Sequence, residues 1–370
     1  MSRAEHIKGV RRIVVKVGTS SVTEGGLISH AKIQKLTDDI SGLIRRGYQV
    51  VLVSSGAIGT GAGALGKDRS VMTIPQRQAL ASVGQVLLIN EYRVCFEAAG
   101  FAIGQILLTE DDVKHRRRFL NGRHTVEALL EMGIVPVVNE NDSVVVKEIK
   151  FGDNDTLSAH VASLIEADLL ILLSDVDGFY MDIERDDAPV SLVEKITPEL
   201  AQRAGGSGTI GGTGGMVTKL SAADVMIRFG EKMIIANSSL PNVLNRVMDG
   251  ENIGTLFLGT GRHMASKKQW IALHKINGTV TIDGGAVDAI CGRKKSLLAT
   301  GVVALQGEFD MGDIVAVVGP NGAEIAKGVV NYKSSELELI AGKRTDEIKK
   351  ILGGAVFYEE VINRDNLVLM

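Results

Sequence analysis

Cysteine is scarce in this sequence, because its 370 residues include only Cys95 and Cys291, which are far apart in the chain. Two cysteines at that separation form neither a disulfide framework nor a zinc motif. The seven histidines show no metal-ligand spacing either. We therefore expect no metal bound by protein side chains alone. The first residues, MSRAEHIKGVRR, lack the apolar segment of a signal peptide, so we expect a cytoplasmic protein.

Long apolar runs and an excess of one charge are also missing. No apolar segment approaches the ~20 residues that a membrane-spanning helix needs. The formal net charge is −3, which gives no sign of a protein that binds nucleic acids or membrane surfaces. The chain is 45% hydrophobic, enough for a sizeable core. At 370 residues it exceeds one ordinary domain, so we expect two.

Residues 1–262 show apolar, β-branched runs that alternate with helical patterns. The six expected strands are 12–17, 48–55, 101–109, 134–138, the first part of 167–180, and 233–237. The fifth is expected to end at Ser174, and 233–237 is expected to be the last strand of this domain. Helical patterns include 33–44, 74–99 and 124–132, whereas 110–123 is expected as a charged connection and 181–203 as a polar peripheral segment. Strands that alternate with helices predict a doubly wound, mostly parallel α/β domain.

The pattern changes near the C-terminus. Residues 263–276 are expected as a linker and contain the only tryptophan. From residue 277 to 370, short strands alternate with Gly and Asp turns, and Pro320-Asn321-Gly322 is typical of a hairpin. We expect a second, small β-barrel domain with a little helix.

The most polar stretch follows the run 134–138. It contains two groups of carboxylates and carboxamides, Asn139 to Asp142 and Asp153 to Asp155, on either side of a strand-like segment, 143–151. A helical pattern follows the second group. One aspartate there is explained by a helix N-cap. Two groups so close together favour a ligand site, because ligands bind beyond the carboxyl ends of parallel strands.

Two other strand ends carry polar or small residues. Lys16 lies near the end of the apolar run 12–17, where a buried ammonium needs an anionic partner, a carboxylate or a phosphate. The alternative is an edge-strand lysine whose head group reaches solvent. The loop Ser54 to Gly59 has small residues that let its backbone N–H groups approach a ligand. Asp175 and Asp177, after Ser174, are either ligands or turn formers.

The strongest compositional anomaly is the segment 205–215, which contains seven glycines and leads into a helical pattern starting at Met216. A glycine-rich loop before a helix N-terminus is typical of a phosphate-binding site, and Lys219 would lie one turn inside that helix. A flexible linker is the alternative.

Two other glycine patterns are misleading. Gly61, Gly63 and Gly66 spell G-x-G-x-x-G, and 61–68 nearly spells a P-loop. The dinucleotide motif needs an acidic residue about 20 positions further on, and the P-loop needs Ser or Thr where this chain has Asp68. Neither nucleotide-binding motif is supported.

Two lysines, a glycine loop and a set of Asp and Asn side chains favour phosphoryl transfer. That chemistry needs charge neutralisation on the moving phosphoryl group and little covalent help from the protein. The acidic group around residue 142 suits an acceptor that carries an amine. The residues alone therefore predict a nucleotide-dependent kinase of a small molecule, without a Walker A loop.

Six motifs in this order resemble the amino acid kinase family: VVKVGTS, VSSGAI, NENDSV, KFGDNDTLSA, LSDVDGFY and GTGGMVTKL. More narrowly, they resemble those members that phosphorylate L-glutamate, and the C-terminal part resembles a PUA domain. The resemblance covers essentially the whole chain. It implies that ATP and L-glutamate give L-glutamyl 5-phosphate and ADP with Mg²⁺, in the first step of proline biosynthesis. The acceptor is already a carboxylate, so no general base is required.

The resemblance also implies roles for individual residues. The expected catalytic residues are Lys16 and Lys219, with Asp155 orienting both lysines. The expected glutamate-binding residues are Ser55, Asp142 and Asn154, with Asn139 and Asp153 close by. The expected ATP-binding residues are Lys16, Ser174, Asp175, Thr213, Gly214, Gly215, Met216, Val217, Thr218 and Lys219. Ser174 departs mildly from the family's usual Thr-Asp pair, because serine keeps the hydroxyl.

The resemblance further implies a homo-oligomer, a dimer or tetramer, and feedback inhibition by L-proline. Two alternatives stay open. The first is another amino acid kinase, acting on acetylglutamate, aspartate, carbamate or UMP. The second is an RNA-binding protein working through its PUA-like domain. RNA binding is not supported by charge, since residues 275–370 contain eleven Lys and Arg against thirteen Asp and Glu, a net charge of −2.

Overall fold

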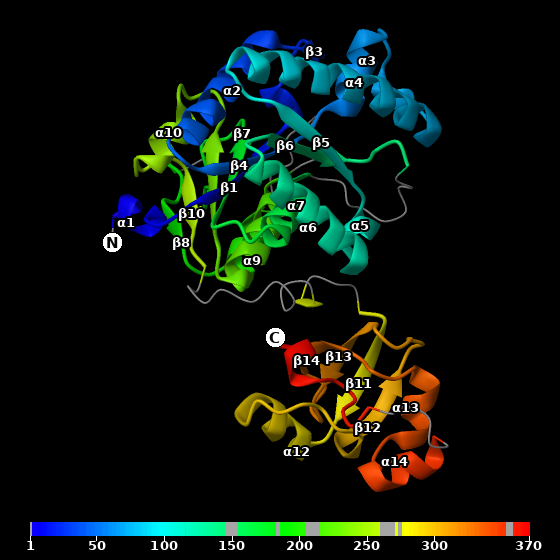
Figure 1. Ribbon diagram of the computed structural model, residues 1–370. Coiled ribbons are helices and arrows are strands. Elements are labelled where there is room, and N and C mark those ends of the chain that lie inside the picture. The colour runs from blue at the N-terminus through cyan, green and yellow to red at the C-terminus, as the bar shows by residue number, and fades with distance from the viewer. Residues whose placement is uncertain are drawn as a thin grey trace. The chain divides into compact units, whose positions relative to one another are not determined.

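The computed structural model describes residues 2–114, 116–144, 154–182, 186–204, 215–259, 271–272, 276–352 and 358–370. The chain forms two compact units, Met1–His263 and Met264–Met370 (Figure 1). Each unit buries a hydrophobic cluster of its own. Along the described residues, no helix combines the length and apolar character needed to cross a membrane.

An eight-stranded sheet forms the centre of the first unit, in the order β5-β6-β4-β1-β7-β9-β10-β8. The six predicted strands all form: β1 (Arg12–Val17), β4 (Gln49–Ser54), β5 (Ile103–Leu108), β6 (Val135–Glu140), β7 (Leu169–Ser174) and β9 (Lys232–Asn237). Neighbours among these six pair in parallel. Their carboxyl ends therefore meet at one edge of the sheet, and the predicted α/β fold is confirmed.

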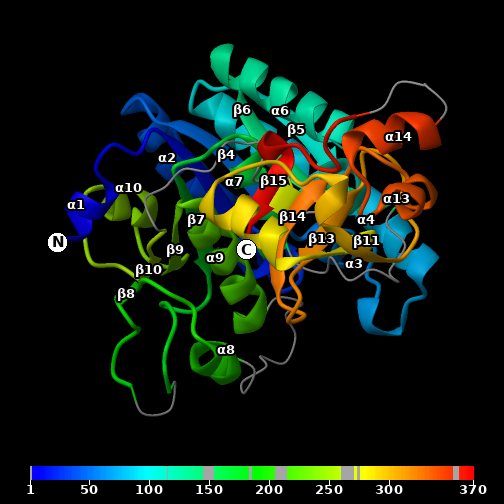
Figure 2. The ribbon, with the colours of Figure 1, turned by 90° about the horizontal axis from the view of Figure 1, so that it is seen from below.

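The other two strands were not predicted. β10 (Thr255–Phe257) pairs antiparallel with β9, and β8 (Leu192–Val193) pairs parallel with β10. The expectation that 233–237 is the last strand is therefore wrong, and the segment 181–203 contributes β8 at the edge of the sheet. Strands of two or three residues are too short to show a period. Figure 2 shows β8, β10 and β9 together at this edge, close to α1 (Arg3–Ile7).

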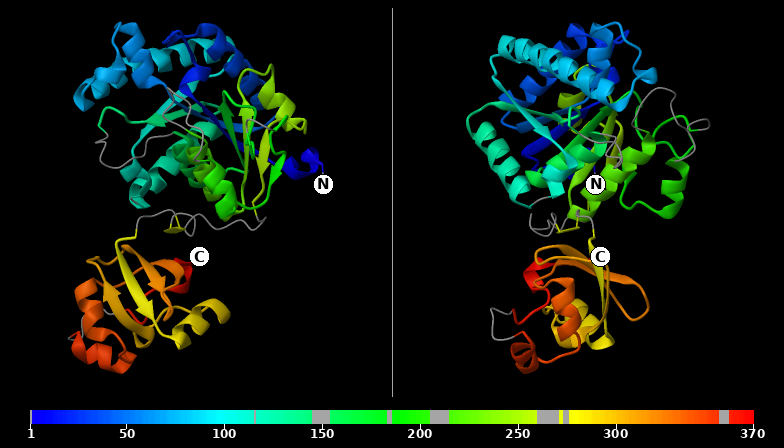
Figure 3. Two further views of the ribbon diagram at one scale, coloured as in Figure 1. Left: turned by 180° about the vertical axis from the view of Figure 1, so that it is seen from behind. Right: turned by 90° about the vertical axis from the view of Figure 1, so that its right-hand side faces the viewer.

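Helices cover both faces of this sheet (Figures 1 and 3). One face packs against α2 (His30–Arg45), α4 (Ile74–Ala98) and α10 (Val243–Met248). The opposite face packs against α6 (Arg116–Glu131), α7 (Asn154–Leu164) and α9 (Met216–Phe229). The remaining helices and short strands of this unit are α3 (Ala57–Ala64), α5 (Glu110–Lys114), α8 (Pro198–Ala204), β2 (Thr23–Glu24) and β3 (Leu27–Ile28).

The predicted charged connection 110–123 is wrong, because α5 and α6 occupy that segment. Phe119 and Val126 lie two turns apart and are both buried, so α6 has an apolar face despite its charges. Beside that face, Arg123 pairs with Glu127 at i+4, with Nε and Oε1 2.8 Å apart. The prediction missed this helix because its sequence contains many arginines and only a few apolar positions that pack.

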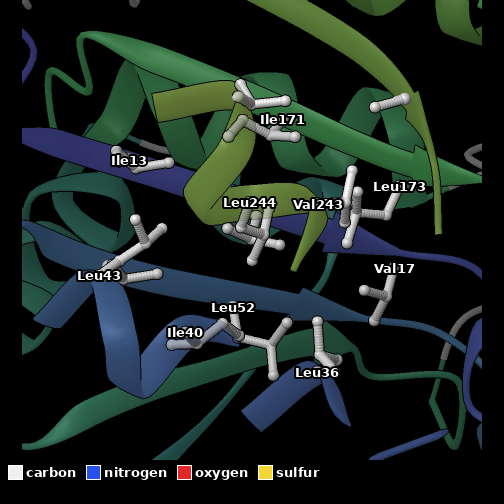
Figure 4. Packing of buried hydrophobic residues seen from close by; sticks show 14 of the residues in the cluster. Ile13, Val17, Leu36, Ile40, Leu43, Leu52, Ile171, Leu173, Val243 and Leu244 are labelled. Carbon is white, nitrogen blue, oxygen red and sulfur yellow. The ribbon is translucent and has the colours of Figure 1, made fainter. Parts of the chain in front are cut away.

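The pleat of β1 decides where Lys16 points. Ile13 and Val17 pack toward α2 and α10, together with Leu52, Ile171 and Leu244 (Figure 4). Side chains on a strand alternate between faces, so Lys16 points to the opposite face, where α7 and α9 lie.

The misleading glycine pattern lies in helix packing. Gly61 is inside α3, and a Cβ there would lie 2.0 Å from the carbonyl oxygen of Leu80 in α4. A Cβ on Gly84 of α4 would lie 1.8 Å from the carbonyl oxygen of Ala57. The two helices cross so closely that only glycine fits at these positions. A Cβ on Gly63 would lie 2.0 Å from the carbonyl oxygen of Gly26, and Gly66 has φ of 60°, so packing and a turn account for the pattern without a nucleotide.

The second unit contains a five-stranded sheet in the order β12-β11-β13-β14-β15. Its elements are β11 (Gly278–Ile282), α12 (Gly284–Val287), β12 (Val302–Gln306), β13 (Ile314–Val318), β14 (Glu324–Val329), α13 (Ser334–Ile340), α14 (Thr345–Ile351) and β15 (Leu367–Leu369). The predicted hairpin is confirmed: β13 and β14 are antiparallel, and Gly322 at their turn has φ of 78°.

Candidate active site

The candidate site lies where the central parallel strands end. Val17 of β1 is in register with Ser54 of β4, and Ser174 of β7 is in register with Asn237 of β9. β6 ends beside β4, with Asn139 near its end. The carboxyl ends of these strands therefore bring several of the predicted polar residues to one edge, although the segments lie far apart in the sequence.

Lys16, Asp155 and Lys219 meet at this edge. Lys16 Nζ lies 2.5 Å from Asp155 Oδ1, and Lys219 Nζ lies 3.2 Å from Asp155 Oδ2. The exposed fractions are 5% for Lys16, 0% for Asp155 and 6% for Lys219. Two ammonium groups thus converge on one carboxylate in a place shielded from water. Positive charges held so close together favour an incoming anion.

Helices hold this cluster from the side of the sheet toward which Lys16 points. Asp155 is the second residue of α7, and Lys219 is the fourth of α9. Thr218 Oγ1 donates to Asp155 Oδ2 at 3.0 Å and also to the carbonyl oxygen of Gly215 at 2.7 Å. Asp155 thus holds the two lysines and the first turn of α9 in one arrangement. Thr218, predicted to bind ATP, contacts Asp155 here.

A second group of predicted residues surrounds the amide of Asn154, which is 8% exposed. Its Nδ2 carries two hydrogens and lies within hydrogen-bond distance of three acceptors, Ser55 Oγ at 2.7 Å, the carbonyl oxygen of Ser54 at 2.6 Å and Asn139 Oδ1 at 2.9 Å. Because Asn154 directly precedes Asp155, this amide network is covalently joined to the lysine cluster.

Two residues of this network escaped the sequence analysis, and both come from α4. Gln85 Oε1 accepts a hydrogen bond from Asn139 Nδ2 at 2.7 Å. Tyr92 OH lies 2.9 Å from Ser54 Oγ, and burial raises the pKa of the Tyr92 hydroxyl. In the sequence, both residues lie within the helical pattern 74–99, where nothing distinguishes them from other helix positions. The one feature that could have indicated a role is that Gln85 is a polar residue on the buried side of α4.

The end of β7 carries the predicted nucleotide pair. Ser174 Oγ donates to Asp175 Oδ1 at 3.0 Å, and the Asp175 side chain is exposed. Asp177 accepts a hydrogen bond from Asn237 Nδ2 at 2.7 Å, so the end of β9 supports the turn after β7. Asn237 is a further polar residue that the sequence analysis did not single out.

The N-terminus of α9 has no side-chain cap. Gly215 precedes it in an extended conformation and has no side chain to cap the helix. The first backbone N–H groups of a helix lack partners within the helix, and the helix dipole favours negative charge there. Met216 is partly buried, and Val217 is exposed beside this end.

The remaining predicted positions are less informative. Asp142 lies in the turn after β6 and is partly buried. Asp153, Thr213 and Gly214 lie outside the described residues, as does most of the expected strand 143–151.

Comparisons with known proteins show the family of this chain. Residues 11–237 match the amino acid kinase family, and residues 278–352 match the PUA domain. The chain therefore belongs to the amino acid kinase family and carries a PUA domain after the kinase domain.

Within that family, several similar proteins are named glutamate 5-kinase. It is 50% identical to the glutamate 5-kinase of Thermoanaerobacter sp. (strain X514), over 97% of this chain and 98% of that protein. It is 46% identical to the glutamate 5-kinase of Trichlorobacter lovleyi, over 98% of each chain. The solved UMP kinase of Bacillus anthracis is 15% identical with a TM-score of 0.47, over 68% of this chain and 97% of that chain. At that identity the UMP kinase says nothing about the substrate.

Proposed function

We propose that this chain transfers the γ-phosphoryl group of ATP to the side-chain carboxylate of L-glutamate, giving L-glutamyl 5-phosphate and ADP as the first step of proline biosynthesis. The observation that carries the proposal is the buried arrangement of Lys16, Asp155 and Lys219 at the carboxyl edge of an amino acid kinase sheet. The relatives named glutamate 5-kinase, which match nearly the full chain, support the choice of acceptor.

In the proposed reaction, a carboxylate oxygen of glutamate attacks the γ-phosphorus, and the bond from that phosphorus to the bridging oxygen of ADP breaks. Negative charge spreads over the transferring oxygens, and Lys16 and Lys219 neutralise it from two sides. Asp155 fixes both ammonium groups before substrate arrives, so little reorganisation is needed. The acceptor is already ionised, so no residue has to remove a proton.

We assign the acceptor side to Ser55, Asn139, Asp142 and Asn154, with Asp153 beside them. The support is the amide network, in which hydrogen bonds join Asn154 of α7 to Ser55 and Asn139 at the ends of two strands, β4 and β6. The Asp142 carboxylate is suited to pair with the α-ammonium group of glutamate. Acetylglutamate lacks that charge, so this assignment favours a free amino acid as the acceptor.

We assign the nucleotide side to Ser174, Asp175 and the segment Thr213 to Lys219. Mg²⁺ enters with ATP, because Mg²⁺ is held mainly by substrate phosphates and waters, with one or two carboxylates. Asp155 is already engaged by two lysines and Thr218, which leaves it poorly suited as a metal ligand. When bound, the ion neutralises phosphate charge.

The test is a coupled ADP-release assay with L-glutamate as the only acceptor. Parallel reactions receive N-acetylglutamate, aspartate, carbamate or UMP. Hydroxylamine added to the glutamate reaction should trap the acyl phosphate as a hydroxamate in proportion to the ADP formed. ADP release on another acceptor, with none on glutamate, would assign the chain to a different kinase activity within the family.

Three properties extend this proposal on the basis of family resemblance. We expect a cytoplasmic enzyme, assembled as a dimer or tetramer, and inhibited by L-proline as the end product. Light scattering measures the assembly, and the same ADP assay with added L-proline measures the inhibition. D-proline is the matched control for the latter.

A further inference from the structure

Three side chains of different chemistry meet between α2 and α4. His30 is the first residue of α2, whereas Glu91 and Cys95 lie one turn apart on α4. His30 Nδ1 is 2.5 Å from Glu91 Oε1, and Cys95 Sγ is 3.9 Å from each of these atoms. All three atoms lie within 4.8 Å of one another. Imidazole, carboxylate and thiol thus surround one point.

We propose that His30, Glu91 and Cys95 form a zinc-binding site, separate from the site of phosphoryl transfer. Zn²⁺ takes nitrogen, oxygen and sulfur ligands in tetrahedral geometry, at ~2.0–2.1, ~2.0–2.2 and ~2.3 Å. Those bond lengths place ligand atoms ~3.3–3.6 Å apart. The sulfur is a few tenths of an ångström beyond that separation. A side-chain rotation of Glu91 opens the short nitrogen–oxygen distance.

The environment of each ligand suits this role. The His30 side chain is 65% exposed and that of Glu91 is 23% exposed, so an ion can enter from solvent. Cys95 is buried on the inner side and supplies the soft ligand that selects zinc over Mg²⁺ or Ca²⁺. Three protein ligands leave the fourth position to water.

The thiol gives the site a measurable signature. A thiol binds a metal ion as the thiolate, so a bound cation would displace the proton of Cys95. Zinc binding should release a proton and strengthen as the pH rises.

An ordinary surface ion pair explains only part of this arrangement. It accounts for His30 and Glu91, but it does not require a thiol 3.9 Å from both. The i and i+4 spacing of Glu91 and Cys95 puts both ligands on one face of α4. His30 is 61 residues earlier than Glu91 in the chain, which is why no ligand spacing was visible in the sequence.

An occupied site would tie α2 to α4. The helix α4 also carries Tyr92, whose hydroxyl contacts Ser54 at the start of the acceptor loop. Zinc would therefore stabilise the helix that supports the acceptor side without touching a substrate.

The experiment titrates the full chain, without any histidine tag, with Co²⁺ as a spectroscopic probe and then displaces it with Zn²⁺. We expect one equivalent of Co²⁺ and a thiolate-to-cobalt charge-transfer band in the near ultraviolet. Zn²⁺ at 100 times its Kd should raise Tm by roughly 5–10 °C. Cys95→Ser should abolish the band, and His30→Gln or Glu91→Gln should weaken binding by more than the ~10–100-fold typical of an outer partner.

Matched controls separate this site from adventitious binding. Cys291→Ser and His124→Gln change an exposed thiol and an exposed imidazole elsewhere, and both should bind Co²⁺ like the unaltered chain. His30→Gln changes an exposed side chain and is expected to fold, which kinase activity verifies. The proposal is overturned by the absence of a thiolate band, by its survival in Cys95→Ser, or by its loss in Cys291→Ser. Equal affinity in the chain and in folded His30→Gln also overturns it.

Discussion

Among single residues, Asp155 has the most demanding position, because it is fully buried and faces two ammonium groups. A buried charge is tolerated only when it is paired. If either lysine is removed, Asp155 still keeps the other lysine and Thr218 as partners. Substitutions of one lysine therefore probe catalysis with less damage to the fold than substitutions of Asp155.

Lys16→Ala and Lys219→Ala should each lower kcat by ~10²–10³-fold, with a much smaller change in the KM for glutamate. The physical reason is lost stabilisation of charge that develops in the transition state. Steady-state kinetics with both substrates varied gives kcat and both KM values. Thr218→Val, which removes a neutral donor to Asp155, is the control and should cost less. A near-normal kcat in either lysine variant would make that lysine structural.

Asp142→Asn should raise the KM for glutamate by ~10–100-fold, with a smaller change in the KM for ATP. The variant keeps the shape and removes the charge proposed to pair with the α-ammonium group, an interaction that contributes ~1.5–3 kcal/mol. If Asp142 only forms the turn after β6, Asn replaces it silently. If it binds Mg²⁺, the KM for MgATP rises instead. Measuring both KM values in the one variant decides among the three roles.

Gln85→Leu should raise the KM for glutamate by about tenfold while leaving the KM for ATP unchanged. Gln85 is a positioning residue, since its Oε1 holds the Asn139 amide that in turn accepts from Asn154. A lost buried hydrogen bond costs ~1–3 kcal/mol. Gln85→Glu keeps an acceptor oxygen and should restore most of the affinity. Equal effects of both variants on both KM values would indicate a packing role alone.

Among the elements, the crossing of α3 and α4 connects the core to the site. α3 begins directly after Ser55 and Gly56, and α4 carries Gln85 and Tyr92. The closeness of this crossing depends on glycines, as the short distances at Gly61 and Gly84 show. A change in this packing should therefore alter the positions of the acceptor-side residues more than the position of Lys16.

Gly84→Ala should destabilise the chain by ~1–3 kcal/mol, the usual cost of overpacking, and raise the KM for glutamate. The new Cβ would lie 1.8 Å from the backbone oxygen of Ala57, so α3 and α4 must separate. Denaturant unfolding measures the stability, and steady-state kinetics measures the KM. Ser82→Ala, on the exposed side of the same helix, is the control and should be nearly neutral. Unchanged stability in Gly84→Ala would show that α3 and α4 can move apart at no cost in free energy.

The long helices and strands with a regular apolar pattern could be predicted from the sequence. Very short strands, and side-chain contacts between distant segments, could not. All six apolar runs form strands, and five of the six bury most of their residues, whereas β5 at the edge of the sheet buries only Leu108. β10 has three residues and forms through pairing with β9, and β8 has two residues and forms through pairing with β10. Likewise, Lys16 and Asp155 were recognisable as candidates, whereas Gln85 gained its role from α4 lying beside β6. Contacts across 54 residues, as between Asn139 and Gln85, leave no local pattern.

For the whole molecule, the two units differ in what they contribute to the proposed reaction. The first buries the large cluster around β1 and carries every described candidate site residue. The second has a separate buried cluster around β11, β13 and β14. Neither described core requires residues of the other, so each unit should fold by itself.

A truncated chain that ends near Arg262 should therefore still phosphorylate glutamate, with kcat and both KM values within a few-fold of the full chain. The reason is that Lys16, Asp155, Lys219 and the acceptor residues all precede that point. Circular dichroism and a cooperative thermal transition first establish that the truncated chain is folded. The ADP assay then measures activity, with residues 277–370 added separately as a control. A folded, inactive truncation would mean that the PUA domain completes the site, and recovery of activity by the separate domain would show that it does so by contact.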